Sequence, residues 1–425
     1  MSQYRAYPTY KDSGIEWIGL VPEHWKVARV KRLASLRNER RNDVSTDTIY
    51  IGLEDVEAGS GQYKPTNGSS RQSEDSTVGI FYEGDVLYGK LRPYLRKAII
   101  SEMAGCCSTE FLVLRAEKTE PRWLQEWLLT PDVTHQIESG CEGAKMPRAD
   151  WGHIGSIEVV YPDQPEQAQI LTTLDRETAR IDALIEKKSR FIELLKEKRQ
   201  ALITHAVTKG LDPNAKMKDS GIEWIEQVPE HWDVKPFFAL VTELNRKNVG
   251  LAETNILSLS YGSIIQKPET RNMGLTPKSY ETYQIVESGE IVFRFTDLQN
   301  DKRSLRSAQV TQRGIITSAY MAVKPHSIDS TYFAWLMRSY DLCKVFYAMG
   351  GGLRQSLKFE DVRRLPVLIP LVDEQSEITN AINAGTARID ALVEKTEQSI
   401  TLLKERRAAF ITAAVTGQID LRGKQ

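Results

Sequence analysis

Two stretches of sequence decide the fold: "TARIDALIEKKSRFIELLKEKRQALITHAVTKGLD" at Thr178–Asp212 and "TARIDALVEKTEQSITLLKERRAAFITAAVTGQID" at Thr386–Asp420. They lie 208 residues apart and agree at 22 of 35 positions. In both, apolar residues recur at intervals of three, four or seven, which predicts a helix with one narrow apolar seam. The seam residues are Ile181, Leu184, Ile185, Ile192, Leu195, Leu202, Ile389, Leu392, Val393, Ile400, Leu403 and Phe410.

Two similar seams in one chain can bury each other, so we expect the two helices to pack together as a coiled coil. The alternative is that each helix packs separately on its own domain. Asp163 and Pro165 are typical of a helix start, and Gly210 and Pro213 are typical of a helix end.

A second repeat stands upstream of each helix. "KDSGIEWIGLVPEHWKV" at Lys11–Val27 returns as "KDSGIEWIEQVPEHWDV" at Lys218–Val234, with 14 of 17 positions identical. We expect His24 and His231 to be structural rather than general bases. The tryptophans are expected to anchor the entrance of a domain to the helices; they are Trp17, Trp25, Trp224 and Trp232.

Two divergent blocks lie between these constant flanks. Short β-branched and aromatic runs such as "DVLYG" and "FLVLRA" predict strands, while "PRWLQEWLLTPD" has helical spacing. The sequence therefore predicts an α+β protein with two mixed α/β domains in tandem, separated by long helices. The expected limits are 1–165 and 218–372 for the domains, 166–217 for the central helix and linker, and 373–425 for the C-terminal helix.

Composition excludes several classes of protein. Charged residues make up 27% of the chain but leave a net charge of −1, so total charge predicts no partner. The four cysteines form no C-x-x-C pair, which favours reduced thiols. No apolar run approaches the about 20 residues that cross a bilayer, and the N-terminus lacks the apolar core of a signal peptide. We expect a cytoplasmic protein without membrane contact.

The usual catalytic motifs are missing from the sequence. There is no G-x-x-x-x-G-K-[ST] loop, no H-E-x-x-H, no G-x-S-x-G and no cysteine–histidine zinc pattern. We therefore expect a non-catalytic binding component with no catalytic residue, no cofactor site and no metal site of its own.

Basic clusters occur at corresponding places in both blocks. "YGKLRPYLRKA" and "FRFTDLQNDKRSLRSAQ" form one matched pair, and the turns after "EGA" and "GGG" form another. Arginine can bond bidentately to guanine, and lysine can neutralise phosphate. Each cluster alone favours a solvated face over a binding site, but the duplication reverses that preference and favours DNA. The candidate DNA-binding residues are Lys90, Arg92, Arg96, Lys97, Lys145, Arg148, Arg294, Lys302, Arg303, Arg306, Arg354 and Lys358.

The repeated "KDSGIEW…VPEHW", the "GKLRP" loop and the paired "TARIDAL" helices together resemble the DNA-specificity subunit of type I restriction-modification enzymes, over essentially the full chain. The resemblance implies that each variable domain recognises one half of a split double-stranded DNA site. It also implies that the two helices pack antiparallel as a spacer and relate the domains by a pseudo-two-fold axis.

The resemblance further implies partner subunits. Two modification subunits would bind S-adenosylmethionine and flip out an adenine for methylation. Restriction subunits would add ATP- and Mg-dependent translocation and cleavage. Two other classes stay open: an autonomous sequence-specific DNA-binding regulator, and a coiled-coil protein scaffold in which the basic loops are idle.

Overall fold

The computed structural model divides into two compact units, residues 1–188 with 398–425, and residues 189–397. It describes residues 4–45, 47–65, 76–141, 143, 145–267, 279–298, 304–349 and 356–422. The two longest helices, α4 (Gln164–Lys209) and α8 (Val372–Val415), each contribute to both units. The predicted domain limits stay predictions.

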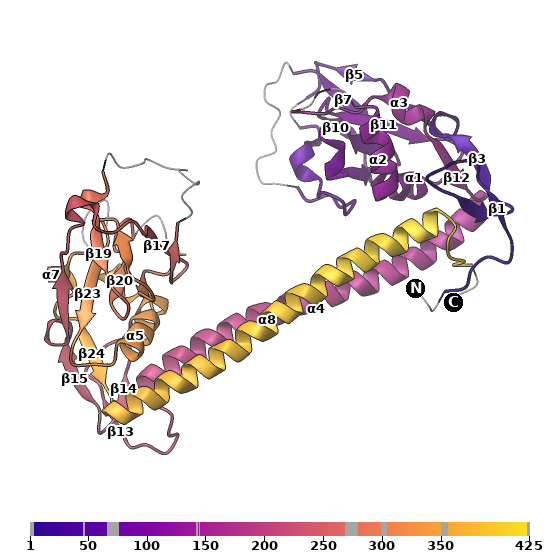
Figure 1. The fold of residues 1–425 in the computed structure, drawn as a ribbon. Helices are drawn as coiled ribbons and strands as arrows, with labels where there is room; N and C mark the ends of the chain where they lie inside the picture. Colours follow the sequence, from indigo (N-terminus) through magenta and orange to yellow (C-terminus); the bar gives the residue numbers. More distant parts are fainter. Residues whose placement is uncertain are drawn as a thin grey trace. The chain divides into compact units, whose positions relative to one another are not determined.

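The first unit combines short strands with three short α-helices (Figure 1). Its main sheet has the order β4-β11-β8-β9, and a second four-stranded sheet has the order β5-β7-β10-β6. The strands are β1 (Tyr10–Asp12), β2 (Leu20–Pro22), β3 (Lys26–Arg29), β4 (Ala34–Leu36), β5 (Arg40–Arg41), β6 (Tyr50–Ile51), β7 (Val78–Phe81), β8 (Val86–Gly89), β9 (Ala98–Ile100), β10 (Gly105–Cys107), β11 (Phe111–Ala116) and β12 (Glu158–Tyr161). The helices are α1 (Pro121–Leu129), α2 (Pro131–Ser139) and α3 (Trp151–Ser156), with 3-10 turns η1 (Val30–Arg32), η2 (Leu53–Asp55) and η3 (Pro93–Leu95).

The second unit repeats this plan with a four-stranded sheet of order β16-β23-β20-β21. Its strands are β13 (Met217–Asp219), β14 (Gln227–Pro229), β15 (Asp233–Pro236), β16 (Val241–Leu244), β17 (Leu257–Ser260), β18 (Ser263–Gln266), β19 (Gln284–Val286), β20 (Ile291–Phe293), β21 (Ser307–Gln309), β22 (Gly314–Ile316), β23 (Met321–Pro325) and β24 (Pro366–Ile369). The helices are α5 (Ser330–Leu342), α6 (Val345–Ala348) and α7 (Phe359–Val362), with 3-10 turns η4 (Phe237–Ala239), η5 (Val249–Leu251) and η6 (Tyr280–Thr282).

Equivalent strands pair in the same register in the two units. Leu112 of β11 lies opposite Tyr88 of β8, and Met321 of β23 lies opposite Phe293 of β20. These strands hold the weakly similar stretches "EGDVLYGK" and "SGEIVFRF". The structural repeat therefore extends through the blocks in which the sequence repeat is faint.

The long helices pack antiparallel within each unit. In the first unit Arg407 Nε of α8 lies 3.0 Å from Asp182 Oδ1 of α4. In the second unit Arg199 Nε of α4 lies 3.0 Å from Asp390 Oδ1 of α8. The two ion pairs are equivalent. At the 208-residue offset, Asp182 and Arg199 of α4 correspond to Asp390 and Arg407 of α8. The predicted α+β fold class with two long antiparallel helices is confirmed.

The predicted seam residues differ in burial. Ile192, Leu195, Ile389 and Phe410 are buried, whereas the equivalent residues Leu184 and Leu392 are 42% and 41% exposed. The remaining six are half-buried: Ile181, Ile185, Leu202, Val393, Ile400 and Leu403.

The repeated "PEHW" joins each domain to a long helix. In the first unit Trp25 Nε1 donates to Glu166 Oε1 (3.3 Å), and His24 Nε2 lies 2.7 Å from Glu166 Oε2. Trp25 is fully buried among apolar residues of both long helices. Because Glu166 stands in the first turn of α4, the contact ties the domain entrance to the start of that helix.

The second unit repeats this joint. Trp232 Nε1 donates to Glu374 Oε2 over 2.9 Å, and His231 Nε2 lies 2.8 Å from the same oxygen. Trp232 is fully buried, whereas Trp224 is 39% exposed. One tryptophan of each repeated segment thus forms the core of the joint.

Candidate nucleic-acid interface

A tight basic turn connects β8 to β9 in the first unit. Its 3-10 turn η3 is bounded by Arg92 and Arg96, whose φ angles of 53° and 49° lie in the left-handed region. That region is unfavourable for residues with a Cβ, so it persists only where neighbouring structure enforces it. Here Arg92 N donates to Pro147 O (2.8 Å), and Arg96 N donates to Pro93 O (2.8 Å).

The two predicted basic segments of this unit lie side by side. Leu91 forms an isolated β-bridge with Arg148, and Ala149 N donates to Lys90 O over 2.8 Å. Arg92 is exposed and Lys90 is half-buried. The chain thereby places cations that are more than 50 residues apart in sequence on one edge of the domain.

The other cations of the second segment are also at the surface. Lys145 is exposed. The side chain of Arg148 is 49% exposed and bonds to Glu110, with Nη2 3.1 Å from Oε1. An exposed ion pair of this kind exchanges partners easily, because solvent screens most of its attraction. Arg148 can therefore exchange Glu110 for a phosphate.

Arg96 and Lys97 point away from this edge. Arg96 Nη1 donates to Leu129 O (3.4 Å), and Lys97 Nζ donates to Leu53 O (2.6 Å). Gly59 N donates to Arg96 O (3.0 Å), so the turn also supports the neighbouring loop. In the described structure, Arg96 and Lys97 therefore make contacts within the domain.

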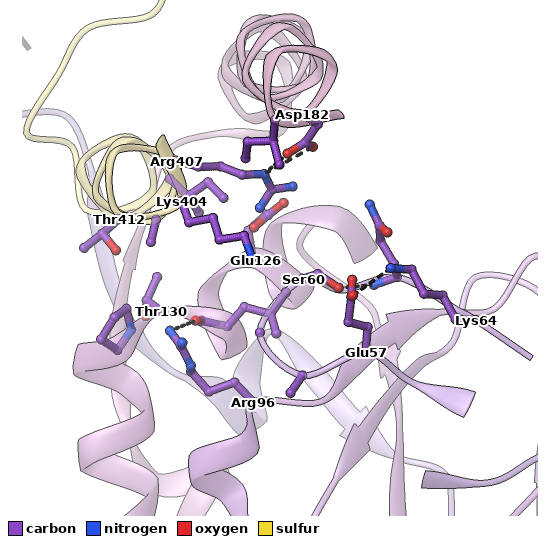
Figure 2. Close-up of a pocket in the computed structure, with 18 of the residues that line it drawn as sticks. Glu57, Ser60, Lys64, Arg96, Glu126, Thr130, Asp182, Lys404, Arg407 and Thr412 are labelled. Atoms are coloured by element: carbon purple, nitrogen blue, oxygen red, sulfur yellow. Dashed lines mark hydrogen bonds and ion pairs between the residues drawn. The ribbon is translucent and has the colours of Figure 1, made fainter. Parts of the chain in front are cut away.

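Arg96 lines a pocket of about 670 Å³ between this domain and the long helices (Figure 2). Four cations and four carboxylates line it, so its formal charge balances; they are Lys64, Arg96, Lys404, Arg407, Glu57, Glu126, Asp182 and Glu186. Burial raises the pKa of Glu126, and Arg122 Nη2 opposes that shift from 2.5 Å. This balance makes the pocket a poor site for a phosphate.

The second unit repeats the juxtaposition of basic segments. Leu357 N donates to Phe295 O over 3.0 Å, the equivalent of the contact between Ala149 and Lys90. Lys358 is therefore next to the turn that begins at Arg294. Lys358 is exposed and Arg294 is half-buried. Three further candidates lie outside the described residues: Lys302, Arg303 and Arg354.

Arg306 differs from its predicted role. It is fully buried, and its guanidinium donates to Thr296 O (3.1 Å), Asp297 O (3.4 Å) and the Tyr347 hydroxyl (3.2 Å). Arg306 N donates to Asp341 Oδ2. Because this side chain has no exposed surface, we withdraw it as a DNA contact. Arg306 instead closes the base of the basic turn.

Sequence reasoning missed the carboxylates that hold these arginines. Glu110 lies 38 residues before Arg148, and Asp341 lies 35 residues after Arg306. Neither carboxylate belongs to a motif or a periodic pattern, so the sequence carries no signal for these contacts. Only the folded chain brings the partners together.

The described residues contain neither a candidate membrane span nor a candidate metal cluster. None of their helices combines the length and the apolar character that crossing a membrane requires. Among the same residues, no three His, Cys, Asp or Glu side chains are grouped so that they could hold a metal ion.

Comparison with known proteins gives relatives of one kind. The chain is 22% identical over 187 residues to the type I restriction enzyme EcoDI specificity subunit of Escherichia coli, covering 44% of this chain and 42% of that protein. It is 20% identical over 280 residues to a putative type I restriction enzyme MjaX specificity subunit of Methanocaldococcus jannaschii, covering 63% and 60%. The chain thus aligns with about half the length of these relatives. No protein-family model matches the sequence.

Solved structures share the fold along nearly the whole chain. A chain from a study of "complex assembly and conformational transition of the type I R-M system" has a TM-score of 0.65 at 15% identity, covering 95% of this chain and 99% of that one. The HsdS subunit from Thermoanaerobacter tengcongensis has a TM-score of 0.52 at 16% identity, covering 94% and 98%. The chain therefore has the fold of an HsdS subunit, and its resemblance to the DNA-specificity subunits of type I restriction-modification enzymes is confirmed.

Proposed function

We propose that this protein is the specificity subunit of a type I restriction-modification system, and that each of its domains recognises one half of a bipartite DNA target. One observation carries the proposal. The same backbone contact, Ala149 to Lys90 and Leu357 to Phe295, joins two basic segments in both units. The arrangement is duplicated while the side chains differ, as expected where two unlike half-sites are recognised in one manner.

The exposed cations divide into two roles. Arg92 is exposed on a turn whose backbone conformation is enforced by its neighbours, and an exposed guanidinium suits bidentate contact with a guanine edge. Arg294 occupies the corresponding turn of the second unit. Lys145 and Lys358 are exposed lysines that suit phosphate contacts, which orient a protein on DNA without specifying sequence.

The chain itself performs no catalysis in this proposal. It docks two modification subunits, which bind S-adenosylmethionine, and restriction subunits, which use ATP and Mg. Exposed leucines that recur at the 208-residue offset support a partner that binds twice: Leu184 and Leu392 are 42% and 41% exposed, and Leu194 and Leu402 are 47% and 64% exposed. Exposed apolar residues that recur on both long helices are typical of an interaction surface.

Arg92→Ala is expected to relax recognition in one half-site only. Losing a bidentate arginine–guanine contact costs about 1–3 kcal/mol at the affected base pair. The measurement is methylome sequencing of a host that carries the variant with its modification subunits. Arg294→Ala should relax the other half-site, and each variant is the control for the other.

Lys145→Ala and Lys358→Ala should instead weaken binding to all sequences alike. Gel-shift titrations with and without modification subunits separate the proposal from its competitors. A regulator binds its site tightly without those subunits, and a scaffold binds no DNA in either case. An unchanged methylation motif in all four variants would move base recognition away from these turns.

Replacing the repeated leucines is expected to weaken docking in steps. Leu194→Lys alone should leave one modification subunit firmly bound, and Leu194→Lys with Leu402→Lys should leave neither, because each copy serves one partner. Light scattering of the purified complex counts the subunits. Phe191→Lys is a matched control, since Phe191 is 45% exposed but its equivalent in the other helix is Ser399. A double variant that keeps both subunits would contradict this docking surface.

A further inference from the structure

An unusual tyrosine stands at the tip of the β17–β18 hairpin. Ser260 pairs with Ser263, so Tyr261 and Gly262 are the two central residues of the connection. Their φ angles are 46° and 77°, the signature of a type I′ turn. Asparagine or aspartate followed by glycine normally fills such a turn, because a bulky side chain is disfavoured in the left-handed region.

The same tyrosine is almost fully in solvent. Tyr261 is 84% exposed, so its ring gains little from burial in the free protein. Its backbone is nevertheless fixed, because Arg338 Nη2 donates to the carbonyl oxygen of the buried Gly262. An aromatic residue that is strained, exposed and firmly held is typical of a contact made with a partner.

Arg338 also connects the hairpin tip to the basic turn. Its Nη2 donates to Ser307 O over 2.9 Å, and Ser307 directly follows Arg306, which closes the base of that turn. Arg294 N donates to Arg306 O over 2.8 Å at the same base. The tip therefore lies beside the segment that carries Arg294 and extends the surface to which we assigned the second half-site.

The hairpin has the form of a two-stranded ribbon with one face free. Leu257 and Leu259 of β17 are buried in the domain core. The outward residues of β18 and its continuation are exposed: Ser263, Ile265 and Lys267. An apolar side chain such as that of Ile265 can contact a thymine methyl group, and a lysine such as Lys267 can neutralise a phosphate.

We propose that the β17–β18 ribbon enters the major groove of the second half-site and that Tyr261 contacts a base there. A two-stranded ribbon fits the width of this groove. The ribbon residues then determine specificity together with Arg294. This inference rests on the proposed function, since it names further residues for the same recognition.

Tyr261→Asn tests the inference, because it separates stability from recognition. Asparagine tolerates the left-handed region, so the thermal midpoint of the full chain should stay the same or rise. Affinity of the complex with modification subunits for its bipartite duplex should fall about tenfold, as expected for the loss of one contact to a base edge in the major groove. Affinity for an unrelated duplex of equal length should not change. Tyr261→Phe should retain most of the affinity.

A second measurement identifies which of the two half-sites is relaxed. Methylome sequencing should show the relaxed position for Tyr261→Asn in the same half-site that Arg294→Ala relaxes. Tyr94→Asn is the matched control: Tyr94 is 49% exposed on the basic turn of the first unit, so its replacement should leave the half-site recognised by the second unit unaltered.

Each contrary outcome has one meaning. Unchanged affinity and motif in Tyr261→Asn, with a relaxed half-site in Arg294→Ala, overturn the ribbon and leave the proposed function standing. Equal weakening on cognate and unrelated duplexes, with a lower thermal midpoint, assigns Tyr261 a structural role and also overturns it. A complex without sequence preference before any substitution overturns the proposed function itself.

Discussion

Inserting seven residues into each long helix is expected to lengthen the gap between the two half-sites by about three base pairs. Seven residues add about 10 Å of helix and return the side chains almost to the same face. B-form DNA rises about 3.4 Å for each base pair. The chosen positions follow Phe191 in α4 and Glu397 in α8, close to the places where both helices pass from one unit into the other.

Methylome sequencing measures this result directly, since it reports both half-sites and their spacing. The ion pairs Asp182–Arg407 and Arg199–Asp390 set one register for the two helices, so paired insertions preserve both contacts. Insertion into α4 alone is the control and should lower stability, because it moves one seam past the other. Unchanged spacing with intact half-sites would refute the proposal that the helices act as a ruler.

Trp232→Ala is expected to lower the free energy of unfolding by about 3–5 kcal/mol, the range for removing a large buried aromatic side chain. Trp232 is fully buried in a cluster that includes Val207 of α4 and Ile378 of α8. The substitution leaves a cavity at this joint. It also removes the donor that lies 2.9 Å from Glu374 Oε2.

Chemical denaturation of the full chain measures the loss, followed by a separate signal from each unit because the two units need not unfold together. Trp224→Ala is the matched control from the same repeated segment. Trp224 is 39% exposed and packs edge-on against Tyr340 at 5.9 Å, so its removal should cost no more than about 1–2 kcal/mol. Similar losses in both variants would show that the repeated segment does not act through its buried tryptophan.

Long, strongly periodic segments were predictable here because their structure depends on local spacing. The helix start expected near Asp163 and Pro165 agrees with α4 beginning at Gln164, and Gly210 follows its last residue. Burial within the seam was less predictable: Leu184 and Leu392 fit the heptad pattern but are exposed. A heptad spacing identifies which residues share a face, and the partner surface decides how much of that face is covered.

The candidate interface shows the same division between sequence and structure. The sequence repeat was enough to predict that the basic turns lie in corresponding parts of the two units. The repeat did not predict where each basic side chain points. Arg92 is exposed, whereas Arg96, four residues later, donates a hydrogen bond to Leu129 O. The side chains of Arg92 and Arg96 point in different directions because both residues have left-handed backbone angles. Nothing in the sequence "KLRPYLRK" predicts these angles.

The sequence by itself determined the duplication, the two long helices, the mixed α/β blocks and the paired basic segments. All of these depend on repeats and on spacing along the chain. Only the tertiary structure decided that Arg306 is buried and that Tyr261 is exposed on a strained turn. The physical reason is that a buried guanidinium needs hydrogen-bond acceptors, which here come from Thr296, Asp297 and Tyr347. Acceptors as distant as Tyr347 come into reach only when the chain has folded.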